Sequence, residues 1–475
     1  MARSPIVLIE FNELTPRLMD RWVEEGKLPT FKRFYKQAQV YRTHAEEEGE
    51  ALNPWVQWVT VHTGLPLARH GIFALNDTHK LTFPQVWDLV SDAGQSVLVC
   101  GSMNAGYRPG LKGFVLPDPW SADVTPYPSK EFDAYHEFVR KNVQEYSRSA
   151  FPVTPADAAR FALYMARHGI SPKTVKSGVS QLWTERRTKR FKWKRAEILD
   201  YLQFDVFNWY WKKHRPQFST FFLNSTAHYQ HSYWRTMEPE KFEVKPSEAE
   251  LADTKNAILY GYETMDGLLK KFMDLAGDDV TLVFATGLSQ QPYLKAEAKG
   301  GKRGYRLRGA EVLAKIGVTG KYSYEPVMAD QFFLRFDNEE DAKKAAEYLP
   351  TVLVEAEAAI RVDRQTGIEL FVQCRLHRLV QNDAMLEIPG KAPMRYYDVF
   401  HLVEGMKSGY HHPDGMLWVR QPNRAHAVHG APVSLRSIAP ALLESLGVKV
   451  PEHMDCPSFL HQSNGKSTQA VASAE

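Results

Sequence analysis

Three short, unbroken apolar runs constrain the fold of this chain more than any other feature. They are Ile6–Phe11, Phe218–Leu223 and 280–285, and such runs are typical of parallel strands that are buried on both faces of a sheet. A further strand is expected at 96–100, and a helix at 253–272 joins two of the runs. We therefore expect an α/β fold, a doubly wound and mostly parallel sheet flanked by helices, with its site beyond the carboxyl ends of the strands.

Length and composition are those of an ordinary globular protein. The chain has 475 residues, of which 44% are hydrophobic and 24% charged, enough for one large core with inserted subdomains. A net charge of +3 argues against a nucleic-acid-binding protein, which would have a far more basic face. The cysteines are far apart and read as reduced thiols, and no apolar run has the length of a signal peptide. These features predict a cytoplasmic protein.

The expected core is interrupted by two insertions. Its three parts are predicted at 1–125, 216–292 and 399–462. The first insertion, 126–215, is expected to be helical and basic, and the second, 293–398, alternates strand and helix patterns. Both are expected to cap the site. Residues 463–475 are small and polar, and predict a disordered tail.

Motifs near both ends of the chain resemble those of one enzyme family. Residues 409–415 contain a G-x-H-x-x-x-G element, residues 5–16 form a strand that ends in polar residues, and 62–72 contain a T-G-x-P turn followed by H-G-I. Together they resemble the alkaline phosphatase superfamily, in particular its type I phosphodiesterase/nucleotide pyrophosphatase branch. The resemblance covers 5–125, 218–290 and 400–460, and it implies an alkaline phosphatase-like fold with a metal-dependent hydrolytic site.

Several residues that the resemblance makes functional are replaced. The metal-binding Asp after the first strand corresponds to Asn12, and two further ligands correspond to Thr286 and Gly287. The nucleophilic Ser or Thr corresponds to Pro54, and no hydroxyl side chain occupies 52–59. The resemblance therefore implies that one of two metal sites is lost and that no covalent phospho-enzyme forms, so that hydrolysis requires direct attack of water.

The other metal site of the family keeps a group of histidines. Its D-x-x-x-H element corresponds to the segment from Ala227 to His231, in which the Asp is absent and His228 is added. With His411 or His412, these residues predict a three-histidine zinc site with an open fourth position, which can activate water and polarise a phosphoryl oxygen. The alternative is a metal-free pocket of hydrogen-bonded histidines.

Further candidates are assigned by their place beside these motifs. Arg235 is expected to act in catalysis together with His228 and His231. The side chains expected to contact substrate are Asn12, Asn53, Ser102, Asn104 and Trp234.

The basic run from Arg186 to Arg195 is interleaved with the aromatic side chains of Trp183, Phe191 and Trp193. Such a pattern is typical of contact with an anionic membrane surface. The alternative is a solvated helix face.

These patterns predict an intracellular hydrolase or transferase that acts on a phosphate or sulfate ester. It would hold at most one zinc or other divalent metal ion and would bind a small anionic, phosphorylated or sulfated substrate, but no nucleic acid. The alternative is a catalytically inactive protein of the same fold that binds an anionic or sugar-like ligand.

Overall fold

A large mixed sheet forms the centre of the computed structural model. The model describes residues 3–75, 77–121, 124–145, 153–188, 191–295, 297–327, 330–403 and 406–461. Within these residues the sheet has nine strands. In spatial order they are β20 (Ala427–Val428), β2 (Gln39–His44), β19 (Asp414–Arg420), β6 (Thr281–Ala285), β1 (Ile6–Phe11), β5 (Phe218–Leu223), β3 (Val97–Cys100) and β4 (Gly113–Leu116), with β21 (Val433–Ser434) beside β2.

The strands predicted from apolar runs lie side by side in the middle of this sheet. From β6 through β1, β5 and β3 to β4, each strand is parallel to the next. On the other side of β6, β19 runs antiparallel to both β6 and β2. The carboxyl ends of β1, β5 and β6 therefore meet at one edge, as the sequence predicted.

Helices cover both faces of the sheet. Val7, Ile9 and Phe11 of β1 join one core cluster, whereas Ile6 and Leu8 join another, because alternate side chains of a strand point to opposite faces. The first face carries α1 (Pro16–Glu24), α2 (Pro29–Tyr35), α9 (Arg195–His214), α10 (Ser225–Met237) and α12 (Ala257–Ala276). The second carries α3 (Pro54–Thr63), α5 (Val86–Asp92) and α16 (Ile438–Leu446), and α4 (Leu67–His70) follows α3. The doubly wound prediction is confirmed.

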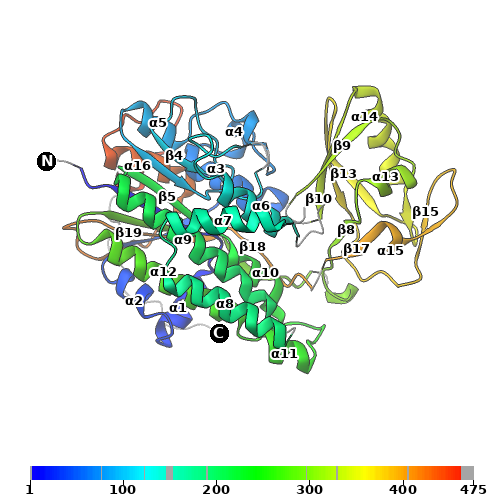
Figure 1. Cartoon of the computed structure of the whole chain (residues 1–475), viewed down its shortest axis with the longest axis horizontal. Coiled ribbons are helices and arrows are strands. Elements are labelled where there is room, and N and C mark those ends of the chain that lie inside the picture. The colour runs from blue at the N-terminus through cyan, green and yellow to red at the C-terminus, as the bar shows by residue number, and fades with distance from the viewer. Residues whose placement is uncertain are drawn as a thin grey trace.

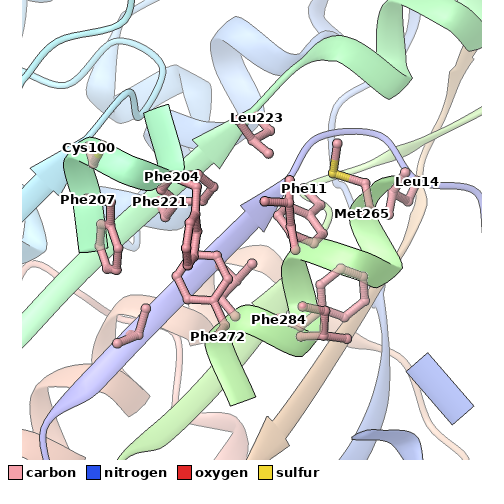
Figure 2. Packing of buried hydrophobic residues seen from close by; sticks show 14 of the residues in the cluster. Phe11, Leu14, Cys100, Phe204, Phe207, Phe221, Leu223, Met265, Phe272 and Phe284 are labelled. Atoms are coloured by element: carbon pink, nitrogen blue, oxygen red, sulfur yellow. The ribbon is translucent and has the colours of Figure 1, made fainter. Parts of the chain in front are cut away.

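Aromatic side chains dominate the first core cluster. Figure 2 shows Phe221 of β5 beside Phe272 of α12, and their ring centroids lie 5.0 Å apart. Phe204 of α9 contacts both rings. Edge-to-face pairs of this kind add about 0.5–1.5 kcal/mol each to the stability gained from area burial. The cluster fixes α9 and α12 against the sheet, and α10 packs on α12.

The first insertion is helical, as predicted. It contains α6 (Asp133–Glu145), α7 (Pro155–Arg167) and α8 (Pro172–Arg187), and it leads into α9. The helix predicted at 253–272 is in fact two helices, α11 (Glu248–Thr254) and α12, because a capping box of Ser247 and Glu250 starts a separate helix first. None of the helices in the described part of the chain is long and apolar enough to cross a membrane.

The second insertion forms a smaller lobe with its own core (Figure 1). One of its sheets has the order β13-β14-β10-β9, another β12-β11-β15-β16, and β17 pairs with β8. The strands are β8 (Tyr305–Leu307), β9 (Tyr322–Pro326), β10 (Gln331–Phe336), β11 (Leu353–Val354), β12 (Glu357–Ala358), β13 (Ile360–Thr366), β14 (Glu369–Cys374), β15 (Met385–Glu387), β16 (Met394–Arg395) and β17 (Phe400–Leu402), and the helices are α13 (Glu311–Lys315), α14 (Glu339–Tyr348) and α15 (Tyr396–Val399). At its base, β7 (Ser289–Pro292) pairs with β18 (Gly409–His412).

Candidate functional site

Three side chains from distant parts of the chain meet at the carboxyl edge of the sheet. They are Glu13, which follows β1, His231 of α10 and His411 of β18, and one ligand atom from each lies within 4.8 Å of the others. Nε2 of His231 lies 3.3 Å from Oε2 of Glu13, and Nε2 of His411 lies 3.7 Å from the same oxygen. The two imidazole centroids are 5.2 Å apart, close to the separation of about 5 Å that a shared ion requires of these two side chains.

Glu13 reaches this position through an unusual backbone. Its φ of 60° lies in the left-handed region, which non-glycine residues adopt at a cost of about 1–3 kcal/mol and mostly at functional sites. Gln230 of α10 donates to the Glu13 backbone carbonyl at 2.7 Å and so stabilises the turn. The strain directs a carboxylate to the point where the strand ends.

The Glu13 carboxylate is buried and held by two amides. Nδ2 of Asn12 donates to Oε1 at 2.9 Å, and Nε2 of Gln290 donates to Oε2 at 2.5 Å. Asn12 therefore supports the carboxylate, as a neighbour that orients a ligand does. The sequence predicted that Asn12 contacts substrate. In the structure its side chain is buried and forms hydrogen bonds with Glu13, Asn224 and Trp58.

Both histidines are oriented by the backbone around them. Nδ1 of His231 lies 3.0 Å from the carbonyl oxygen of Gly409, and this contact orients the ring with Nε2 facing Glu13. His411 pairs across the β18–β7 ladder with Gln290, so both side chains project to the face on which Glu13 lies. His411 also lies against the backbone of Leu52.

The charges of the cluster suit a cation. Burial raises the pKa of Glu13, but His411, His231 and the hydrogen bonds to the carboxylate outweigh burial and lower that pKa to about 2. Burial lowers the pKa of His411 to about 4, against the opposing effect of Glu13. At neutral pH the cluster therefore holds one carboxylate and a neutral imidazole at His411, the forms that bind metal.

This donor set fits a zinc or similar ion. Two imidazoles and one carboxylate with an open fourth position are a recurrent catalytic zinc arrangement, and the amides behind Glu13 and the carbonyl behind His231 supply the usual second shell. The carboxylate replaces the third histidine that the sequence analysis expected. In the sequence, the only signal for Glu13 as a ligand was its position next to Asn12.

The structure does not bring His228 or His412 into this cluster. His228 stands one helical turn before His231 on α10, but it is exposed and is not among the side chains whose ligand atoms converge. His412 follows His411 on a strand and so faces the opposite side, where its Nδ1 accepts a hydrogen bond from the backbone of Asp414. Of the predicted histidines, His231 and His411 remain.

A tryptophan lies beside two of the positions where the resemblance implies ligands of a second metal ion. Trp58 of α3 is fully buried, and its Nε1 donates to Oδ1 of Asn12 at 2.7 Å. A Cβ atom on Gly287 would lie 3.1 Å from the same indole. Two of the positions where the resemblance implies second-site ligands thus contact this ring, and an indole offers a cation no lone pair in its plane.

The start of α3 carries no nucleophile. Asn53 is its N-cap, with Oδ1 accepting from the Val56 backbone at 3.1 Å and Nδ2 donating to the Glu50 carbonyl at 2.7 Å. Pro54 occupies the first helical turn, where its missing N–H costs nothing. The prediction that Asn53 contacts substrate is not supported, because capping occupies both ends of its amide.

Other predicted site residues serve the fold instead. Ser102 is buried and donates to Glu10, and Asn104 is buried between the carbonyls of Trp55 and Ala74. The loop after β3 therefore packs inward.

Two further α10 side chains, Trp234 predicted to contact substrate and Arg235 predicted to act in catalysis, are likewise engaged elsewhere. Trp234 is fully buried and donates to Glu238 at 2.9 Å. Arg235 forms an ion pair with Glu250 and contacts the Val244 carbonyl. The partners of both side chains thus lie outside the Glu13–His231–His411 cluster.

One lysine that the sequence did not single out stands beside the cluster. The Lys302 ammonium lies 5.2 Å and 5.6 Å from the ring centroids of Tyr293 and Tyr410, and its charge is close enough to His411 to affect its pKa. Burial, then the nearby Lys407, lower the pKa of Lys302 to about 8. The site therefore has a cationic side next to its metal-binding side.

No family model matches the chain, and no curated protein matches it. Among solved structures it is similar to phosphonoacetate hydrolase from Sinorhizobium meliloti 1021 in complex with phosphonoformate, with 13% identity, a TM-score of 0.41, and coverage of 94% of this chain and 96% of that one. It is also similar to murine ectonucleotide pyrophosphatase/phosphodiesterase 5, with 11% identity, a TM-score of 0.42, and coverage of 97% and 99%. The human form has 10% identity, a TM-score of 0.43, and coverage of 96% and 98%.

Proposed function

We propose that this chain hydrolyses a phosphate or sulfate ester by direct attack of water, at a single divalent metal ion held by Glu13, His231 and His411. The observation that carries the proposal is the convergence of these three side chains, with their ligand atoms within 4.8 Å of one another. When bound there, zinc or a similar ion supplies Lewis-acid polarisation of the ester oxygen and lowers the pKa of water.

The residues of the chain provide position and charge. Asn12 and Gln290 hold the Glu13 carboxylate in one orientation, and the Gly409 carbonyl holds the His231 ring. The buried indole of Trp58 occupies the space on the other side of Asn12. In this proposal the protein binds one metal ion, whereas the resemblance to the family implies two.

Lys302 supplies the recognition of an anion in this proposal. Its ammonium is backed by two tyrosine rings and stands near Lys407, so that an anionic group entering beside His411 would meet two positive charges. A charge-assisted hydrogen bond to such a group is about twice as strong as a neutral one. We infer that the substrate is a small ester with a negatively charged phosphoryl or sulfuryl group.

The test begins with metal content. Protein purified without a histidine tag, and then stripped with chelator, is titrated with zinc or manganese, and bound metal is measured by elemental analysis. We expect one ion per chain in the wild type and almost none in His231→Ala. Hydrolysis of 4-nitrophenyl phosphate, bis(4-nitrophenyl) phosphate and 4-nitrophenyl sulfate should appear only after metal is restored.

Two results would refute the proposal in different ways. A second ion per chain would show that Trp58 does not close the neighbouring site. Binding of a phosphate ester to metal-free protein at unchanged affinity, with no product under any metal condition, would instead establish an inactive binding protein, the alternative that the replaced catalytic residues favour.

A further inference from the structure

Helix α8 exposes its apolar side and buries polar side chains, the opposite of an ordinary surface helix. Its outer side carries Val175, Val179, Leu182 and Trp183, which are 47%, 62%, 58% and 55% exposed. Their spacing of i, i+4, i+7 and i+8 places them on one stripe, which a surface helix normally buries. We call these four residues the α8 apolar stripe. Figure 1 shows α8 in the lower part of the larger lobe.

The inner side of α8 is polar and already occupied. Thr174 is buried and donates to Asp205 of α9 at 2.5 Å, and Gln181 donates to the Phe191 carbonyl at 2.9 Å. Because polar groups hold the helix on the protein, the α8 apolar stripe is not needed for that packing. A contiguous exposed apolar stripe of this kind marks an interaction site.

The charges around the stripe have one sign. Lys173, Lys176, Arg186 and Arg187 of α8 are exposed, and the Arg187 guanidinium lies 3.5 Å from the centroid of the Trp183 ring. The acid of this helix, Glu185, points inward, with a side chain only 7% exposed, and it pairs with Arg195. The outer face is therefore apolar and cationic, with no carboxylate of its own helix to neutralise it.

The structure relocates the surface that the basic run predicted from the sequence. Trp193 packs edge-on against Tyr229 and Tyr260, at centroid distances of 5.5 and 5.3 Å, so it belongs to the core. Phe191 is only partly exposed and caps a short turn. Lys189 and Arg190 lie outside the described residues. Of the three aromatic residues in the predicted pattern, Trp183 on α8 is the exposed one.

We propose that the outer face of α8 docks this protein onto an anionic bilayer surface. An interfacial helix buries an apolar face with Trp and Leu at the level of the headgroups while Lys and Arg contact anionic lipid, and α8 presents both kinds of side chain outward. The apolar stripe explains why a bilayer fits better than a soluble polyanion, and the cationic flanks explain why the bilayer should be anionic. The proposal does not depend on the metal site.

Vesicle sedimentation tests the docking surface with the full chain. The protein is mixed with vesicles of phosphatidylcholine alone, or of phosphatidylcholine with phosphatidylglycerol in a ratio of about 2:1. We expect binding to the mixed vesicles, weakened by salt, and little binding to the neutral ones. Replacing Leu182→Ser and Trp183→Ser together should weaken binding by at least about tenfold, and Lys176→Gln or Arg186→Gln by about fivefold each.

A matched control separates docking from general surface hydrophobicity. Leu379 and Val428 are 46% and 58% exposed elsewhere on the molecule, and Leu379→Ser with Val428→Ser should leave vesicle binding unchanged. All these side chains are exposed, so circular dichroism and Tm should not change. The proposal fails if the wild type binds neither vesicle, or if the α8 double variant binds as well as the wild type. It also fails if sedimentation without lipid shows a dimer that this variant abolishes, because the stripe would then join two copies of the chain.

Discussion

At the scale of single residues, the carboxylate of the site is one position later in the sequence than the resemblance implies. The place where the resemblance implies a metal-binding Asp holds Asn12, and the carboxylate is supplied by the next residue, Glu13. The positive φ of Glu13 makes this possible, because it turns a side chain that follows the end of the strand back toward His231 and His411. Asn12, which stands where the resemblance implies an Asp, donates a hydrogen bond to the Glu13 carboxylate.

Adjacent histidines offer a matched pair of variants. His411→Ala should lower metal affinity and kcat by at least about hundredfold, since the loss of a residue that merely orients a ligand already lowers them by about 10–100-fold. His412→Ala should leave both nearly unchanged, because His412 faces Asp414. Metal stoichiometry and hydrolysis of 4-nitrophenyl phosphate check both variants; equal losses in the two would contradict the assignment of His411.

At the scale of elements, α3 keeps its place at the site but not a nucleophile. The helix begins at Pro54 with Asn53 as its N-cap, and the backbone of Leu52, the residue before the cap, contacts His411. The hydroxyl groups of its two threonines already have partners. Thr63 donates to the Val59 carbonyl at 2.6 Å, and Oγ1 of Thr60 lies 3.3 Å from Nε2 of His70 in α4. The element therefore shapes the site without offering an exposed hydroxyl.

Rapid quenching with labelled substrate should accordingly give no phosphoserine or phosphothreonine in the α3 peptide. Mass spectrometry of the quenched digest would detect such an adduct. Its recovery on Thr60 or Thr63 would mean that a buried hydroxyl becomes the nucleophile and that water does not attack directly.

The contact between α9 and α10 predicts a pH dependence of stability. Burial raises the pKa of Asp200 from 3.8 to about 8, partly opposed by the hydrogen bond from Ser225, the first residue of α10. The folded state thus keeps a proton that the unfolded state releases, so this group's contribution to stability is complete below about pH 4 and is lost as the pH rises toward 8.

Asp200→Asn should remove this dependence, because the amide stays neutral. Urea unfolding at pH values of about 5 and about 8 should show that the stability of the wild type relative to the variant falls at the higher pH, by at most about 1.4 kcal/mol per pH unit. A difference that is the same at both pH values would show that Asp200 is ionised in the folded protein.

At the scale of the whole molecule, the smaller lobe reaches the site through its base. Lys302 precedes β8, pairs through its backbone with Lys407, and places its ammonium against Tyr410, the neighbour of His411. The insertion therefore adds positive charge to a cluster that the sheet and α10 assemble. Metal binding and anion recognition belong to different parts of the chain.

Lys302→Met should separate these two functions. We expect KM for an anionic ester to rise by at least about tenfold, as the loss of a hydrogen bond to a charged group requires, with metal content unchanged and kcat little affected. Lys321→Met is the control, because that side chain lies on the same lobe but is 86% exposed. A loss of metal from Lys302→Met would show that the lysine supports the ligands instead.

The sequence alone was sufficient to predict the sheet and its buried parallel strands. Unbroken apolar runs report burial on both faces wherever they stand, and the lack of a hydroxyl in 52–59 needs no structure to be seen. The strands predicted at 6–11 and 218–223 coincide with β1 and β5, because an unbroken apolar run is a local signal.

Only the tertiary structure decided which side chains meet. The choice of His411 over His412 depends on which face of β18 turns toward the sheet, and the entry of Glu13 depends on one backbone angle. Trp58 meets Asn12 and Phe222 because α3 packs on the second face of the sheet. These outcomes follow from strand order, register and packing between distant segments, which local periodicity does not record.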